Sequence, residues 1–149
     1  AANAVAASGL MNSDIEREMS YKKAKSYLSL GQRESAIPLF EKLSREYVSA
    51  EGAESAYQLV LNAYEEGDFD KVETLVYAFS DAGSPQMYWL AKSFIVLGDS
   101  FVDRGELAQA KATFESVRDG YTPEGTDDDV LDNVNMRLKK LEEMVAEQN

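Results

Sequence analysis

Carboxylates are the side chains of this chain best placed to do chemistry, and the densest group of them is the run Asp127-Asp128-Asp129. Such a run could ligate Ca²⁺, which takes about six to eight oxygens in a shaped loop. The run does not match the 12-residue calcium loop of EF-hands, because no glycine falls at the turn position and no glutamate at the twelfth position. After Thr126, the same residues fit the start of a helix, where acidic side chains stabilise the positive end of the helix dipole. We therefore expect a helix start and not a metal site.

Residues that could support catalysis lack suitable partners. The chain has no histidine and no cysteine, so the commonest general base, the commonest transition-metal ligand and the thiol nucleophile are all missing. The pairs Glu65/Glu66 and Glu142/Glu143 are adjacent in sequence and splay apart on a helix, unlike the opposed carboxylates of glycosidases. No phosphate-binding glycine motif occurs. A serine activated by a lysine stays open as an alternative, but the sequence favours a protein that is not an enzyme and binds no cofactor.

Charge and hydropathy narrow the classes of partner. With 15 basic and 27 acidic residues the formal net charge is −12, which repels a phosphate backbone and steers toward basic partners. We therefore expect no nucleic-acid partner. No apolar run approaches the roughly 20 residues that span a bilayer, so we expect no membrane span. The uncharged start, AANAVAASGLM, lacks the basic flank and apolar centre of a signal peptide.

A unit of about three dozen residues occurs three times. Within it, the segments LGQRESAIPLFEKL, EGDFDKVETLVYAF and RGELAQAKATFESV align without gaps, and their glycines, Gly31, Gly67 and Gly105, are 36 and 38 residues apart. Apolar or small residues follow each glycine at offsets of 5, 9 and 12, which is one face of a helix. These positions are Ala36, Val72 and Ala110; Phe40, Val76 and Phe114; Leu43, Phe79 and Val117.

Each unit is predicted to be a helical hairpin. The glycine takes the positive-φ position that ends the first helix. Small residues at Ala24, Val60 and Gly98, seven positions earlier, let the two helices approach closely, and the later aromatic fills the space against the next pair. Helix starts are expected at the capping box Ser13–Glu16, at Ser84-Pro85 and at Thr126. The predicted units are 13–48, 49–83 and 84–122, followed by a capping helix at 126–149; residues 1–12 are the tail of a preceding repeat or, alternatively, a leader.

The pattern resembles the tetratricopeptide repeat over roughly Asp14 to Tyr121. Its best unit, AKSFIVLGDSFVDRGELAQAKATFESV, carries the family's succession of small, aromatic, glycine, alanine and aromatic residues. The middle unit departs from it at Val72 and Val76, and the first lacks the usual bulky residue at Ser20. The resemblance implies an all-α, right-handed superhelix of about three hairpins plus the capping helix, which acts as a protein-interaction scaffold.

In this family the first helix of each hairpin lines a concave groove that binds a protein or peptide partner. Carried over by position, the groove residues are Tyr21, Lys22, Lys25, Tyr57, Gln58, Leu61, Tyr64, Lys92, Ile95 and Asp99. Tyrosines among polar groups are typical of interaction surfaces. Alternatively, Tyr57 and Tyr64 only complete the packing between repeats. Trp89, Phe94 and Phe101 are expected in the core.

The resemblance also bears on the kind of partner and on location. The family's clamp for the C-terminal carboxylate of heat-shock chaperones is disfavoured, because only Lys25 and Lys92 of its pattern are present. The third unit is similar to C-terminal repeats of large tetratricopeptide proteins of Bacteroidetes-type bacteria and, more loosely, to envelope assembly proteins. This implies scaffolding in the bacterial envelope or periplasm, while the residues themselves leave the location open. The alternative function is self-association, with neighbouring repeats or a second copy stacking on the exposed end.

Overall fold

The computed structural model describes the backbone of residues 2–148 and the side chains of residues 12–148. All regular secondary structure in this part of the chain is helical, which confirms the predicted all-α class. The helices are α1 (Ala2–Ser29), α2 (Arg33–Leu43), α3 (Ala50–Glu65), α4 (Phe69–Asp81), α5 (Met87–Asp103), α6 (Leu107–Gly120) and α7 (Val130–Gln148).

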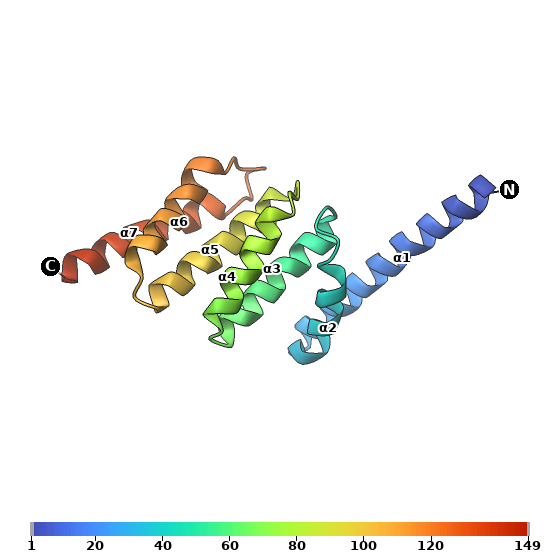
Figure 1. Cartoon of the computed structure of the whole chain (residues 1–149), viewed down its shortest axis with the longest axis horizontal. Helices are drawn as coiled ribbons and strands as arrows, with labels where there is room; N and C mark the ends of the chain where they lie inside the picture. Colours follow the sequence, from blue (N-terminus) through green and yellow to red (C-terminus); the bar gives the residue numbers. More distant parts are fainter. Residues whose placement is uncertain (1, 149) are drawn as a thin grey trace.

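The seven described helices stack in chain order along one axis (Figure 1). Each contacts only the next helix or the next but one. Three hairpins, α1/α2, α3/α4 and α5/α6, therefore follow one another, and α7 packs on α6 and α5. The protein is a helical repeat solenoid of the tetratricopeptide type, in which each hairpin shields the apolar side of its neighbour.

Glycines end the first helix of every hairpin, as the repeat predicts. Gly31, Gly67 and Gly105 have φ values of 73°, 75° and 76°, in the left-handed region that only glycine enters without strain. The residue after each glycine donates its backbone N–H to a carbonyl five positions earlier, at 2.8, 3.0 and 2.9 Å. This is the hydrogen bond of a Schellman cap. The same turn therefore repeats three times, once in each hairpin.

The core is built from the repeated positions. Every residue at offsets 5, 9 and 12 after a cap glycine is at most 6% exposed. Gly98 is buried on α5, and a Cβ placed there would overlap the ring of Phe114 on α6. Close approach of these two helices thus requires glycine at this position, as predicted from the small residue in the repeat. Phe101, expected in the core, is buried, while Trp89 and Phe94 are only half-buried.

Three predicted helix starts differ from the structure. α1 runs without a break through Ser13–Glu16, because the alanine-rich residues before them favour helix more strongly than the capping signature favours a start. α5 begins at Met87, since Ser84 instead accepts from the N–H of Gln86 and donates to the carbonyl of Tyr47. α7 begins at Val130, where its first N–H is bonded by Asp128. The predicted role of residues 1–12 rests mainly on side chains outside the described residues.

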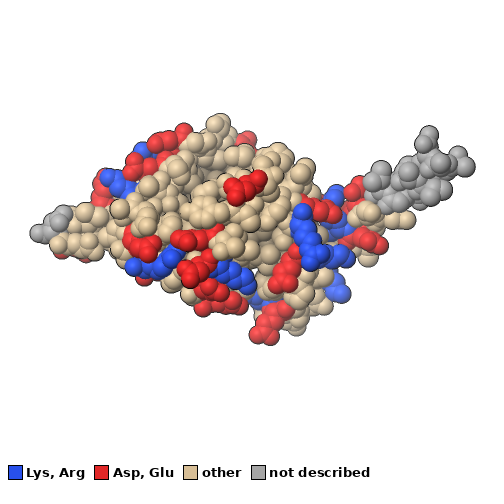
Figure 2. Space-filling view, viewed as in Figure 1, with Lys and Arg blue, Asp and Glu red and all other residues tan. Residues whose placement is uncertain are grey.

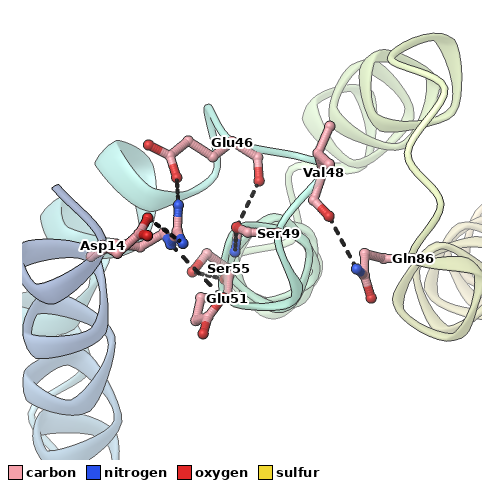
Figure 3. Close-up of polar contacts among 9 residues, drawn as sticks. Asp14, Glu46, Val48, Ser49, Glu51, Ser55 and Gln86 are labelled. Atoms are coloured by element: carbon pink, nitrogen blue, oxygen red, sulfur yellow. Dashed lines mark hydrogen bonds and ion pairs between the residues drawn. The ribbon is translucent and has the colours of Figure 1, made fainter. Parts of the chain in front are cut away.

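A polar network joins the first hairpin to the second on the side shown in Figure 3. Arg17 of α1 lies 3.0 Å from Asp14, 2.9 Å from Glu46 and 4.0 Å from Glu51. In the same loop Ser49 caps α3 by accepting from the N–H of Gly52 at 2.9 Å. The loop between α2 and α3 is therefore held at Glu46 by Arg17 of α1 and at Ser49 by the first turn of α3. Among the described residues, no helix has the length and apolar character needed to cross a membrane.

Candidate functional site

The predicted groove residues lie on the first helices of the three hairpins, α1, α3 and α5. Side-chain contacts link these helices in series, and the series continues to α7. We call the surface that carries these contacts the groove face. It consists of the predicted groove residues together with Glu54, Tyr88, Trp89, Val96, Asp103, Asp129, Asn133 and Arg137.

The α1–α3 link centres on a buried carboxylate. Glu54 is 6% exposed. Its carboxylate accepts a 2.8 Å hydrogen bond from the Tyr21 hydroxyl and a 2.6 Å charge-assisted hydrogen bond from the Lys25 ammonium. A buried charge is costly unless it is paired and hydrogen-bonded, and these two side chains satisfy both conditions. Two predicted groove residues thus have a structural role. Lys22 instead points to solvent beside Glu18, at 3.1 Å.

The α3–α5 link combines rings with a lysine. Tyr57 of α3 packs on Trp89 of α5 with ring centroids 5.5 Å apart. The ammonium of Lys92 lies 5.4 Å from the centroid of the Tyr57 ring. Further along the same pair of helices, the Tyr64 hydroxyl donates to Asp103 at 2.7 Å. Tyr57 and Tyr64 therefore do pack between repeats, while both also line an open cavity.

The α5–α7 link brings in residues that the sequence reasoning missed. Arg137 donates two hydrogen bonds to the carboxylate of Asp99, at 2.8 and 3.1 Å, in the bidentate geometry typical of arginine. The Tyr88 hydroxyl donates to Asp129 at 3.0 Å. Asp129, Asn133 and Arg137 are spaced four apart, and this spacing was a readable signal of one polar helix face. α7 was interpreted only as a cap, yet it also completes the groove face.

A cavity of about 270 Å³ opens on the groove face between α3, α5 and α7. Six predicted groove residues line it: Tyr57, Leu61, Tyr64, Lys92, Ile95 and Asp99. The remaining lining residues are Val96, Asp129, Asn133 and Arg137. Tyr21, Lys22, Lys25 and Gln58 lie outside it. Ile95 and Val96 are buried, so they form the floor of the cavity, and the charged groups form its rim.

Tyrosine hydroxyls on this face are held in the neutral form. Desolvation, assisted by the hydrogen bond to a carboxylate, raises the pKa of Tyr21, Tyr64 and Tyr88 to about 12 each. Burial likewise raises the pKa of Tyr57. A neutral phenol can donate to a carboxylate, while a phenolate would repel it. Burial and the neighbouring carboxylates therefore extend to higher pH the range over which these hydroxyls stay neutral.

The acidic run Asp127-Asp128-Asp129 shapes the loop before α7. Asp128 accepts the Tyr121 hydroxyl and the backbone N–H groups of Glu124 and Val130, at 2.9 and 3.0 Å for the last two. Burial opposes the ionised form of Asp128, but these hydrogen bonds outweigh it and lower its pKa. Within residues 12–148, no group of three or more acidic side chains is arranged to hold a metal ion.

On the face shown in Figure 2, acidic and basic side chains lie next to one another along the edges of the array. The central area is mostly uncharged, with an acidic group near its middle. The groove-face cations Lys22, Lys25, Lys92 and Arg137 each lie next to a carboxylate. These four cations therefore form no free basic patch that would offset the negative net charge of the chain.

Comparison with known proteins agrees with this architecture. Residues 18–49, which cover most of the first hairpin, match the family model of the tetratricopeptide repeat. Searches of curated proteins and of solved structures find no significant match to the chain. The matched segment includes Tyr21, Lys22 and Lys25 of the groove face. Repeats of this family generally mediate protein–protein interactions and are typically non-catalytic.

Proposed function

We propose that the protein is a non-catalytic scaffold that binds an extended or helical segment of a partner protein along the groove face. The observation that carries this proposal is the cavity between α3, α5 and α7. Its buried apolar floor, Ile95 and Val96, lies beneath a polar rim. Such a combination suits an anchoring side chain whose apolar part is buried and whose polar end meets the rim.

The chemistry of the partner follows from charge. The chain carries a net charge of −12, and the groove-face cations Lys22, Lys25, Lys92 and Arg137 each already lie within 4 Å of a carboxylate. An acidic segment would meet a repulsive field with no free counter-charge among these cations. A basic segment would be attracted, and its association rate would fall as salt screens the field. We therefore assign the groove face to a segment rich in lysine and arginine.

Two substitutions of opposite sign test this assignment without disturbing the pairs that join neighbouring helices. Gln58→Arg adds a positive charge at a half-exposed position of α3, and Lys22→Glu replaces an exposed cation of α1. The immobilised chain is used to capture proteins from a lysate of the source organism, and captured proteins are quantified by mass spectrometry. Gln58→Arg should lose basic partners, whereas Lys22→Glu should retain or gain them.

Gln109→Arg is the matched control, because it adds the same charge at an exposed position on α6, outside the groove face. Its capture list should equal that of the unmodified chain. If Gln58→Arg also captures the same proteins in the same amounts, the groove face is not the binding surface.

Self-association is the second candidate function. Large apolar side chains are exposed toward both ends of the array: Ile15 and Met19 on α1 are 50% and 65% exposed, and Met136 on α7 is 51% exposed. Stacking of copies would cover them. Light scattering over a range of concentrations decides this point, since a mass that stays at 16.5 kDa removes the stacking proposal.

For the cellular setting we propose assembly work in a bacterial envelope. This setting is supported by the resemblance of the third repeat unit to envelope repeat proteins. Fractionation of source cells followed by immunodetection tests it, and recovery of the protein only with cytosolic markers would contradict it.

A further inference from the structure

Three aromatic rings surround one ammonium group on the groove face. The Nζ atom of Lys92 lies 5.4 Å from the Tyr57 centroid, 5.4 Å from the Tyr88 centroid and 6.0 Å from the Trp89 centroid. The rings also contact one another: Trp89 is 5.5 Å from Tyr57 and stands edge-on to Tyr88 at 5.0 Å. We call Tyr57, Tyr88 and Trp89 the ring box. Ring faces arranged in this way attract cations, as in aromatic cages for ammonium groups.

The polar contacts of Lys92 are long. Its ammonium is 3.4 Å from the Tyr88 hydroxyl and 3.8 Å from the nearest oxygen of Asp129. Lys25, on the same face, contacts Glu54 at 2.6 Å and lies near a single ring. Lys25 is thus held by a short charge-assisted contact, while Lys92 is held mainly by the rings. An ammonium donor group at 3.4 Å and beyond gains little hydrogen-bond energy.

The cavity of the groove face gives access to the ring box. Tyr57, Lys92 and Asp129 line that cavity. A side chain that enters it therefore reaches the Asp129 carboxylate and the Tyr57 ring of the ring box. An arginine is better suited to this place than a lysine. Its guanidinium is less strongly hydrated, stacks on rings, and can bond a carboxylate with two donors.

We propose that the ring box is a cation-binding site whose resident occupant is Lys92, and that an arginine of the bound partner segment displaces the Lys92 ammonium. Only the source of the arginine rests on the proposed function; the box itself is a property of this chain. Lys92 then acts as an internal competitor: a cation enters the box only if it binds the rings better than the Lys92 ammonium does, which favours arginine over lysine and so adds specificity.

Trp89 makes the site measurable without a partner, because it is the only tryptophan of the chain. Lys92→Met removes the competing ammonium and keeps an unbranched side chain of similar length. Its tryptophan fluorescence is titrated with acetyl-arginine-amide, with acetyl-lysine-amide, and with acetyl-citrulline-amide as an uncharged analogue of arginine. Lys22→Met is the matched control, since it removes an exposed lysine that touches no ring.

In Lys92→Met, acetyl-arginine-amide should bind about tenfold more tightly than in the unmodified chain or in Lys22→Met, a difference of about 1.4 kcal/mol, which lies within the range of cation–π contacts. The lysine probe should bind more weakly and the citrulline probe should not compete. Replacing Tyr57 by leucine in the Lys92→Met background should abolish the gain. Equal affinity for the arginine and citrulline probes, or no gain over the unmodified chain, overturns the proposal.

A second measurement uses the unmodified protein and does not depend on any variant folding. Ring currents from three aromatic faces should move the ε-methylene proton resonances of Lys92 upfield, and addition of acetyl-arginine-amide at high concentration should move them back. Resonances at ordinary lysine positions would show that the box is not occupied and would end the proposal. A positive ring-box result together with unchanged capture by Gln58→Arg would reject the proposed function alone.

Discussion

The hydroxyl of Tyr64 on α3 donates a 2.7 Å hydrogen bond to the carboxylate of Asp103 on α5. The same pairing of phenol and carboxylate recurs at each step along the groove face. Tyr21 donates to Glu54 between α1 and α3, and Tyr88 donates to Asp129 immediately before α7. Successive first helices are therefore joined by a repeated tyrosine–carboxylate link, which adds a polar contact to the apolar packing of the repeat.

These links predict a loss of stability at alkaline pH. Unfolded tyrosine has a pKa of about 10. In the folded chain, desolvation and the carboxylate partners raise the pKa of Tyr21, Tyr64 and Tyr88 to about 12. The stabilisation is therefore complete below about pH 10 and is lost as the pH rises from about 10 to 12. The melting temperature of the unmodified chain should fall across this pH range, and the melting temperature of Tyr64→Phe should fall less steeply. An equal slope in both proteins would remove Tyr64 from the explanation.

Lys25→Met should destabilise the first hairpin. The substitution leaves Glu54, which is 6% exposed, without its cation, although Tyr21 still donates to it. We expect a loss of about 1–3 kcal/mol in the free energy of unfolding, less than for a fully buried pair because Lys25 is itself partly exposed. Urea unfolding followed by circular dichroism measures it. Lys25→Met/Glu54→Gln should recover part of the loss, and no recovery would argue against a charge effect.

Gly98→Ala should also destabilise the chain, for a purely steric reason. The added methyl group would overlap the Phe114 ring, so α5 and α6 must separate or the ring must move. Overpacking of this kind costs about 1–3 kcal/mol. Gly120→Ala is the control, because nothing lies within 4 Å of a Cβ there and the residue has no positive φ. In thermal unfolding, the melting temperature of Gly120→Ala should equal or exceed that of the unmodified chain, while that of Gly98→Ala should be lower. Equal melting temperatures for the two variants would contradict the packing argument.

Arg137→Met should loosen α7 selectively. It removes the two hydrogen bonds to Asp99 that join α7 to the groove side of α5, and we expect a cost of about 1–2 kcal/mol. Amide hydrogen exchange should accelerate in α7 and much less in α3. Arg118→Met, which removes an exposed arginine that pairs with the adjacent Asp119, should leave exchange unchanged. Uniform acceleration over all helices would indicate a global effect instead.

Much of the fold was readable because the repeat places the same residue types at the same offsets. Cap glycines such as Gly67 and buried positions such as Phe40 follow from φ preference and helix periodicity, which are local properties. Helix starts were less predictable. Ser13 has a capping signature, yet it lies inside α1, because neighbouring helix formers compete with the cap and the balance depends on packing.

The sequence predicted which helices carry the residues of the candidate site, but it did not predict which partners their side chains contact. Lys25 was placed correctly on a first helix, but sequence does not say that its ammonium meets a buried Glu54 from 29 residues away. Such pairings depend on the angle between hairpins, which local patterns do not specify. The contribution of α7 was missed for a related reason: an amphipathic helix after the last repeat predicts a cap, and Arg137 gains its role only once α5 lies beside it.

Contacts between helices extend only one or two helices along the described chain. No contact of the described chain therefore reaches beyond the next hairpin or α7, and the chain can nucleate at any hairpin and grow outward, with a low entropic cost of loop closure. Unfolding should be graded in the same way: α3/α4 packs between two other hairpins of the described chain, so we expect its amides to be among the slowest to exchange. A partner bound to α3, α5 and α7 together would hold these helices against one another, and its binding would slow local unfolding of α7 most.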